Sequence, residues 1–327
     1  MDPSAALSQP TPEQLFDPRL NQLVCESIAR IRGDLDRLAP YSAAEMSRWI
    51  DRQSEPDTPE GCFRGLKAHF LVIPWFLELR IRGNIDLEFQ RALVYSSINA
   101  YYFVRLLDNI SDGHAMGDLF LLPMAALFHA NFQSAYSAWF EPRSPFWKYF
   151  NELWIGMADA TVENSRARTF SEAEFVAVSA RKIAAVKIPV AAVCSRYDRP
   201  GLLGPWLDFY DRFACSHEML DDLCDWHSDM EAGRSSFLLS EAASRKAPGE
   251  SIEAYLVRAG LAAGYDKMVG WLGEASRLAR ALDSELLESF LRYRSDRVES
   301  FWNSLQPSLQ QLDKLARVLE GRSHGAG

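Results

Sequence analysis

The sequence predicts an all-α protein, and three observations support this expectation. Apolar residues recur at i, i+3, i+4 and i+7 along most of the 327 residues, as they do on one face of a helix. Glycine and proline number only 18 and 16, whereas an all-β chain must turn roughly every eight to twelve residues. No solenoid repeat and no Gly/Ser linker divides the chain. We therefore expect one helical domain at 19–320, with disordered tails at 1–18 and 321–327.

Each periodic segment between breakers predicts a helix. In chain order these segments are 19–38, 42–52, 62–81, 86–111, 116–139, 145–164, 171–197, 202–231, 235–245, 250–272 and 283–319. The intervening breakers include Pro40, Pro56, Gly83, Gly113, Pro142, Pro200 and Pro248. Ser171 and Glu174 have the spacing of a capping box, which opens the helix at 171. The apolar run 70–81 also suits a buried strand, but the chain offers no partner strand, so we expect a helix there.

Charge and cysteine usage exclude several classes of function. The chain has 44 acidic and 35 basic side chains, a net charge of −9, which argues against nucleic-acid binding. Its five cysteines are scattered and form no C-x-x-C pair, so a reducing, cytoplasmic location is expected. Apolar runs such as 119–128 are shorter than the roughly 18 to 20 residues of a membrane helix, so we expect no integral membrane span.

The first concentration of acid inside an apolar segment is Asp108 and Asp112. Their spacing of four places both carboxylates on one helical face, which continues through Val104 and Tyr101 as a largely apolar wall. Like charges at this spacing repel each other, so a cation is expected between them. Hard oxygen ligands suit Mg²⁺, which keeps several waters and accepts substrate phosphates in its remaining positions.

The second concentration is denser and lies at 218–229. It contains Glu218, Asp221, Asp222, Asp225 and Asp229, five acids within twelve residues of an otherwise apolar helix. Carboxylates at intervals of four often form only a solvated helix face. The functional interpretation depends on two acidic clusters with a basic segment between them, which carries Arg181, Lys182 and Lys187. Such a set predicts a cage for metal ions and a diphosphate.

The run Glu218-x-x-Asp221-Asp222-x-x-Asp225, followed by Asp229-x-x-x-Gly233-Arg234-x-Ser236, resembles the second aspartate-rich motif of class I isoprenoid enzymes. This superfamily comprises the trans-prenyl diphosphate synthases, the squalene/phytoene synthases and the class I terpene cyclases. The pair Asp108 and Asp112 then occupies the place of the first motif. The resemblance covers about 60–300 of the chain, with its specificity concentrated in 218–236.

The resemblance implies a single-domain helical bundle of the class I terpenoid synthase type around a central apolar cavity. The implied metal ligands are Asp108, Asp112, Asp221, Asp222 and Asp225, with Asp108, Asp112, Asp222 and Asp225 as catalytic residues. They would hold three Mg²⁺ ions, or Mn²⁺ in their place, on an isoprenyl diphosphate. Arg181, Lys182, Lys187 and Arg234 would bind diphosphate oxygens, and Tyr101, Val104, Phe213 and Glu218 would line the cavity. Ionisation of the substrate would leave a carbocation that needs a dry, aromatic environment.

The sequence also departs from parts of the superfamily. The ten residues after Asp112 contain no arginine, whereas chain-elongating synthases carry an arginine pair directly after the first motif. The Asn-x-x-x-Ser-x-x-x-Glu triad of many bacterial cyclases is also absent. Arg292-Tyr293 resembles the Arg-Tyr pair that caps the site in such cyclases. The preferred function is therefore a class I terpene synthase, a carbon–oxygen lyase that cyclises or quenches the cation.

Three alternatives stay open at this point. The nearest is an isoprenyl transferase or a head-to-head condensing enzyme of the same superfamily, and a homodimer is compatible with either. A di-iron helical bundle expects Glu-x-x-His sequences, which do not occur here. A helical interaction protein without catalytic activity is the most distant alternative.

Overall fold

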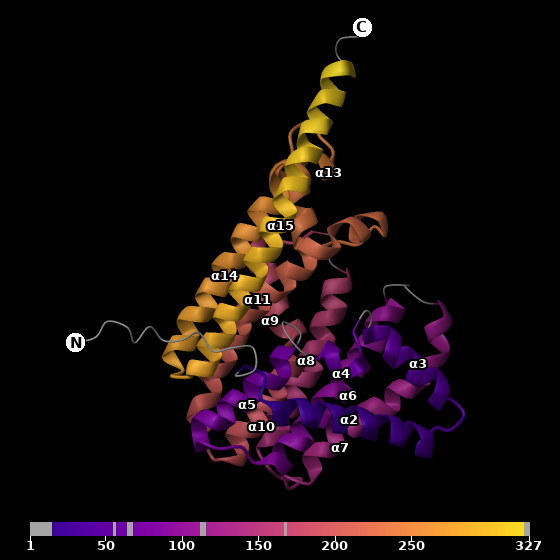
Figure 1. Cartoon of the computed structure of the whole chain (residues 1–327), viewed down its shortest axis with the longest axis vertical. Coiled ribbons are helices and arrows are strands. Elements are labelled where there is room, and N and C mark those ends of the chain that lie inside the picture. Colours follow the sequence, from indigo (N-terminus) through magenta and orange to yellow (C-terminus); the bar gives the residue numbers. More distant parts are fainter. Residues whose placement is uncertain (1–14, 55–56, 64–67, 112–115, 167–168, 324–327) are drawn as a thin grey trace, which may run out of the picture. The chain divides into compact units, whose positions relative to one another are not determined.

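A computed structural model describes residues 15–54, 57–63, 68–111, 116–166 and 169–323. Within these ranges the regular structure is entirely helical, which confirms the predicted all-α class, including the helix at 70–81 (Figure 1). No helix in the described ranges is long and apolar enough to cross a membrane. Residues 1–14 and 324–327 of the expected tails lie outside the described residues, whereas Asp17 caps the first helix and the last helix continues to Ser323.

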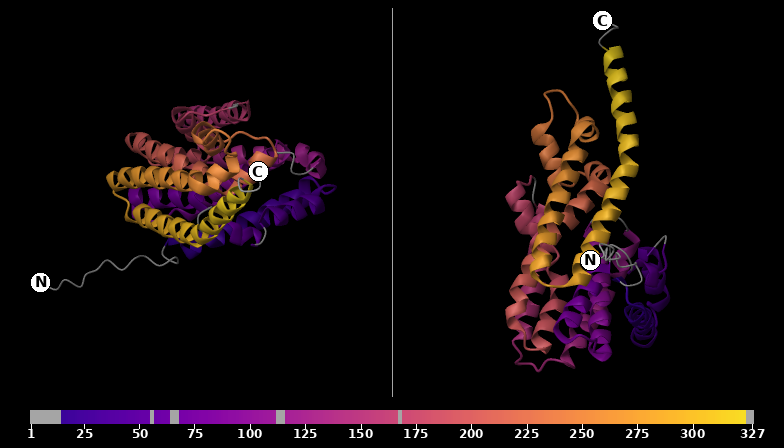
Figure 2. Two further views of the ribbon diagram at one scale, coloured as in Figure 1. Left: turned by 90° about the horizontal axis from the view of Figure 1, so that it is seen from above. Right: turned by 60° about the vertical axis from the view of Figure 1, so that its left-hand side comes forward.

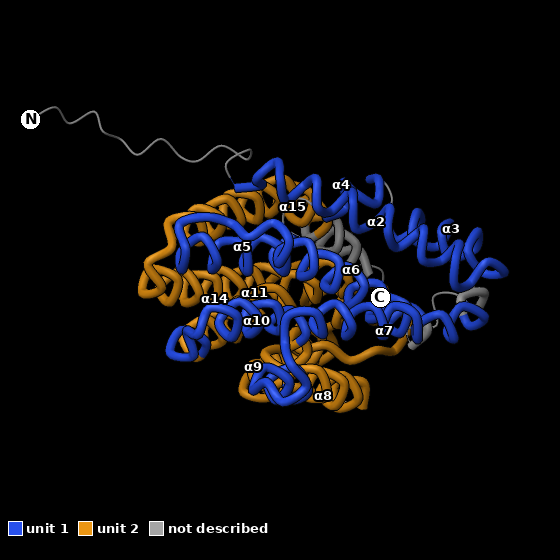
Figure 3. The backbone as a smooth tube through the Cα atoms, turned by 90° about the horizontal axis from the view of Figure 1, so that it is seen from below, with its two compact units in different colours: residues 1–152, 185–203 blue, residues 153–184, 204–327 orange. Residues whose placement is uncertain are grey.

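The chain divides into two compact units, and it passes from one to the other three times (Figure 3). Unit 1 contains 1–152 and 185–203, and unit 2 contains 153–184 and 204–327. Three helical elements contribute to both units, α8 (Phe146–Arg166), the short η3 (Ala184–Lys187) and α11 (Pro200–Glu231). The single domain at 19–320 stays a prediction.

Unit 1 is built around α6, which packs on α2 and α7. Its elements are α2 (Pro18–Leu38), α3 (Ala43–Ser54), α4 (Pro59–Cys62), α5 (His69–Arg82), α6 (Leu87–Ser111), η2 (Met116–Met124), α7 (Ala125–Ser137), η3 (Ala184–Lys187) and α10 (Ile188–Arg196). Aromatic rings form part of the core, with Tyr102 5.9 Å from Trp49 and 5.6 Å from Phe128 between ring centroids. The fully buried Glu78 accepts hydrogen bonds from Gln90 and Tyr197, which ties α5 to α6 and to the end of α10.

Unit 2 contains the C-terminal helices and the acidic part of α11. Besides α8 and α11 its elements are α9 (Glu172–Lys182), α12 (Phe237–Arg245), α13 (Ile252–Tyr255), the π-helical turn η4 (Leu256–Gly260), α14 (Leu261–Ala281) and α15 (Glu285–Ser323). Helices α14 and α15 lie side by side (Figure 2). The rings of Tyr265 and Trp302 stack between them, with 4.5 Å between their centroids. Phe175 of α9 stacks on Phe237 of α12 at 4.7 Å.

Four predicted helices are wrong in part. The segment 250–272 contains a π-helical turn at 256–260, and its last α-helix continues to Ala281. The segment 116–139 begins as the 3₁₀ helix η2, and the α-helix starts only after Pro123, which has no N–H to donate. The segment 171–197 is three pieces, because Pro189 interrupts the α-helical hydrogen bonds and 184–187 becomes a 3₁₀ turn. The segment 62–81 holds the end of α4 and most of α5, with 64–67 outside the described residues.

Candidate functional site

The acidic part of α11 provides the core of the candidate site in unit 2. Four of the acids share one helical face, because Asp222, Asp225 and Asp229 follow Glu218 by four, seven and eleven residues. Asp221 and Asp225 are exposed, whereas Glu218, Asp222 and Asp229 are partly buried. Two of the five carboxylates are therefore open to solvent, and the other three are partly shielded from it by the protein.

Lys182 forms an ion pair with Glu218 and so joins α9 to α11. The side chain of Lys182 is 30% exposed and that of Glu218 is 13% exposed, so water reaches the pair only in part. Burial acts to lower the pKa of Lys182, but the carboxylates of Glu218, Asp222 and Asp221 together outweigh this effect, so the pKa is raised. Lys182 therefore stays positively charged beside the acidic face. Such a charge suits a residue that contacts an anion.

Asp222 lies one turn after Glu218 and reaches the start of α12. Its Oδ2 accepts a hydrogen bond from the backbone N–H of Leu238 at 3.1 Å, while Ser236 caps the same helix through Leu239. Burial is the largest influence on Asp222 and raises its pKa to about 7, with the neighbouring charge of Glu218 adding to the rise. A nearby cation would therefore stabilise the ionised form of Asp222 more than it would stabilise the exposed carboxylates.

Asp229, Gly233 and Arg234 form the turn that ends α11. Arg234 donates its backbone N–H to the carbonyl of Asp229 at 2.8 Å and its Nε to the carboxylate of Asp229 at 2.9 Å. Gly233 adopts the left-handed conformation, with φ of 66°. This is the usual geometry of a helix C-terminus, where glycine avoids the strain of a Cβ. The Asp-x-x-x-Gly-Arg part of the motif thus has a local structural role, and Arg234 already neutralises one acid.

A buried arginine that the sequence interpretation passed over lies behind the acidic face. Arg294 of α15 is fully buried, its Nη2 is 3.1 Å from Nδ1 of His217, and its guanidinium lies 4.7 Å from the ring centre of Phe213. Burial lowers the pKa of Arg294 to about 10, and it also lowers that of His217 to about 4, an effect to which the charge of Arg294 adds. Arg292, from the pair that resembles a capping Arg-Tyr, is exposed and donates a hydrogen bond to Ser289.

The other predicted diphosphate ligands lie in different surroundings. Arg181 lies in the last turn of α9 and forms ion pairs with Glu163 and Asp159 of α8. Lys187 belongs to unit 1, where its side chain is buried at 5% exposure. Unit 2 therefore brings together Lys182 and Arg234 with the acids of α11, whereas Arg181 is held by other carboxylates.

The first acidic motif belongs to unit 1. Asp108 is partly buried on α6, on the same face as Val104 and Tyr101, as predicted from their spacing. Tyr101 contacts the rings of Phe63 and Phe70, at 5.1 and 6.0 Å between centroids. Asp112 lies outside the described residues.

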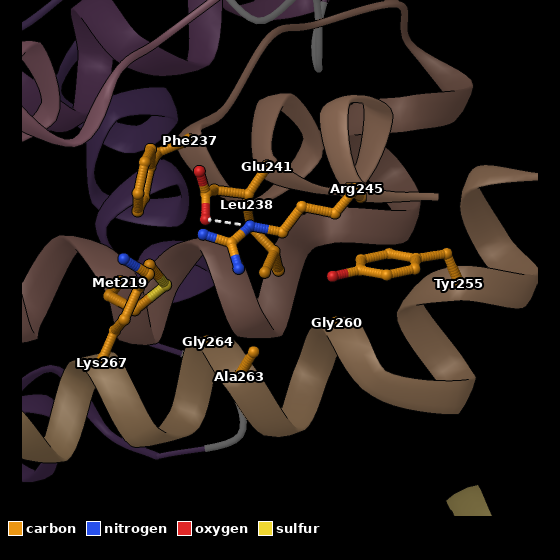
Figure 4. A pocket seen from close by; sticks show the side chains of 11 residues that line it. Met219, Phe237, Leu238, Glu241, Arg245, Tyr255, Gly260, Ala263, Gly264 and Lys267 are labelled. Atoms are coloured by element: carbon orange, nitrogen blue, oxygen red, sulfur yellow. Dashed lines mark ion pairs between the residues drawn. The ribbon is translucent and has the colours of Figure 1, made fainter. Parts of the chain in front are cut away.

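A small pocket adjoins the acidic face on the side of α12 and α14 (Figure 4). The side chain of Leu238, whose N–H is bound by Asp222, lines it together with Met219 and Tyr255, and an ion pair of 2.9 Å joins Glu241 to Arg245 at its edge. Its enclosed volume is about 10 Å³, which is room for one water molecule. This pocket cannot hold an isoprenyl chain, so the central apolar cavity stays a prediction.

The carboxylates of α11 meet part of the requirement for Mg²⁺. Among the described residues, no three carboxylate, imidazole or thiol groups are close enough together to hold a metal ion by themselves. Mg²⁺ usually takes one or two carboxylates and completes its shell with waters and substrate phosphates. The oxygen donors of Asp222 and the exposed Asp225, one turn apart, are of the kind and number that such a site needs.

A search against protein-family models and curated proteins found no match for the chain.

Proposed function

We propose that the chain is a Mg²⁺-dependent class I terpene synthase, which ionises an allylic isoprenyl diphosphate and lets the carbocation cyclise or be quenched. The observation that carries the proposal is the setting of Asp222. Its carboxyl group is partly buried beside Glu218, its pKa is raised to about 7, and a fixed lysine lies on the same side of the helix bundle. Such a site binds a complex of cation and anion better than either ion alone.

In the proposed mechanism, Asp222 and Asp225 hold the metal, and Asp108 and Asp112 are included from the sequence resemblance alone. Bound Mg²⁺ would neutralise the diphosphate as the carbon–oxygen bond breaks. Lys182 would exchange part of its contact with Glu218 for a phosphate oxygen, and Arg234 would add a second cationic donor. The buried Arg294 would strengthen the positive potential behind the acidic face without reaching the substrate.

The test is turnover of geranyl, farnesyl and geranylgeranyl diphosphate with Mg²⁺, each alone and with isopentenyl diphosphate. Hydrocarbon or alcohol formed from a single allylic substrate, with diphosphate released, supports a terpene synthase. A product that requires two substrates indicates the prenyl-transferring or condensing alternative. No turnover of any allylic diphosphate would favour a helical protein without catalytic activity.

Asp222→Asn is the decisive variant, because asparagine keeps an acceptor for Leu238 N–H but loses the charge. We expect at least a hundredfold loss of diphosphate release, on the order of 3 kcal/mol of transition-state stabilisation. Asp208→Asn is the matched control, since Asp208 is an exposed acid on the same helix. Equal activity of the two variants would remove Asp222 from the mechanism.

A further inference from the structure

A second charged feature of unit 2 is an open groove between α14 and α15, on residues that the proposed function does not use. Three arginines line it, Arg277 and Arg280 from the end of α14 and Arg292 from α15, with Glu288 as the one carboxylate of the lining. The groove has a volume of about 410 Å³, which is in the range of small-ligand sites. Its lining therefore carries a net charge of two positive units.

These three arginines differ from most others in the same unit. All three side chains are exposed, and within the described part of the chain none of them forms an ion pair; Arg292 only donates to Ser289 at 2.8 Å. By contrast, carboxylates pair with Arg181, Arg212, Arg234, Arg245 and Arg258. Neighbouring like charges on a helix repel each other, and a bound anion would remove that repulsion.

Two small residues, Gly273 and Ser276, also belong to the lining of the groove. A Cβ atom added at Gly273 would meet no atom within 4 Å, so the space beside it is open. A compact anion can therefore approach the helix backbone between the guanidinium groups. Guanidinium groups bind phosphate oxygens in pairs, which lysine does not do, so the donors present suit a tetrahedral oxyanion.

We propose that this groove binds a phosphorylated small molecule through its phosphate group. Arg277 and Arg280 hold the phosphate from α14, and Arg292 closes on it from α15. The carboxylate of Glu288 limits the positive potential, which disfavours long polyanions and leaves a site for one phosphate group. The site is independent of the acidic face of α11 and needs no metal ion.

The test is calorimetric titration of the full chain with glycerol 3-phosphate in EDTA, so that no metal-dependent site contributes. Two variants change the groove in different ways. Arg277→Gln with Arg280→Gln removes charge, and Gly273→Leu adds a bulky side chain to the lining while all three arginines remain. Their matched controls are Arg297→Gln, an exposed arginine elsewhere on α15, and Gly270→Leu, a helical glycine of α14 whose added Cβ also meets nothing within 4 Å. Circular dichroism verifies that each variant folds.

We expect both groove variants to weaken binding by about tenfold or more, and both controls to bind as the wild type does. Absence of binding in the wild type, or full affinity in Gly273→Leu, would overturn the proposal. A parallel arm uses vesicles containing phosphatidic acid. Binding to vesicles without binding of glycerol 3-phosphate would also overturn it, since the ligand would then be a membrane surface.

Discussion

Nη2 of Arg294 lies 3.1 Å from Nδ1 of His217, and this contact determines the protonation state of the imidazole ring. A guanidinium group has only donors, so Nδ1 must accept and the ring proton must be on Nε2. Burial and the charge of Arg294 lower the pKa of His217 to about 4, which keeps the ring neutral at neutral pH. The helix that carries the acids thus also holds an uncharged histidine against a buried cation.

Arg294→Gln should raise the pKa of His217, because it keeps a donor for Nδ1 but removes the positive charge. A rise of about one unit is expected, to a value still below the ordinary 6.5, since burial remains. NMR titration of the imidazole signals measures the change, with the exposed His227 as internal reference. An unchanged His217 titration would show that the charge of Arg294 has no influence there.

The pH dependence of stability should reveal two opposing groups. The pKa of His217 is about 4 when folded and about 6.5 when unfolded, so its contribution is lost as pH falls from about 6.5 to 4. The pKa of Asp222 is about 7 when folded and about 3.9 when unfolded, so its contribution is lost as pH rises over about 4 to 7. In the wild type the two groups change the free energy of unfolding with pH in opposite directions, so their effects nearly cancel between about pH 4 and 6.5.

Asp222→Asn should therefore make the free energy of unfolding rise with pH relative to the wild type, by up to about 1.4 kcal/mol per pH unit between about pH 4 and 6.5. His217→Asn should give the opposite slope. Urea unfolding in metal-free buffer across this range measures both. Parallel curves for the wild type and the two variants would contradict the pKa values of these groups.

Lys182→Met should destabilise unit 2 by about 1 to 3 kcal/mol, since it leaves the partly buried carboxylate of Glu218 without its ion pair. Glu218→Gln should cost less, and the double variant should recover part of the loss of Lys182→Met. A double-mutant cycle from urea unfolding isolates the interaction. Additive effects would mean that the pair contributes nothing to stability.

Substitution by alanine at two glycines of α14 should change the free energy of unfolding in opposite directions. A Cβ at Gly264 would lie 3.0 Å from Leu238 Cδ1 and 3.1 Å from Leu223 Cδ2, so Gly264→Ala should destabilise by about 1 to 3 kcal/mol. A Cβ at Gly270 meets nothing, so Gly270→Ala should stabilise by about 0.5 to 1 kcal/mol through helix propensity. Thermal unfolding of the two variants compares them directly. Stabilisation by both would show that α14 packs less closely on α11 and α12.

Most helices could be predicted from apolar periodicity, because their buried stripes repeat with the helical period. The failures have local causes. The run 119–124 is apolar at nearly every position, so its periodicity could not distinguish the 3₁₀ helix from an α-helix. At 184–187 the α-helix is interrupted because of Pro189. Proline is common in the first turn of a helix, so its presence in the sequence did not by itself predict an interruption before it.

The acidic cluster on α11 could be predicted because its spacing is visible in one segment. Arg294 was missed because it is one of several arginines in α15, and only its register with the buried Leu287, Leu291 and Val298 distinguishes it. Gly233 and Arg234 have a structural role that their spacing alone did not reveal. Their spacing suited a diphosphate motif, yet the same residues are what the C-terminal turn of α11 requires.

The three passages of the chain between the units have a consequence during synthesis. Residues 153–184 leave the ribosome before 185–203, so the first part of unit 2 emerges while unit 1 still lacks α10. Unit 1 cannot be completed until about three fifths of the chain has been made, and no single cleavage point would release either unit whole. The two units must therefore fold in overlapping steps. Helix α9 can pack only after its partners α11 and α12 have been translated.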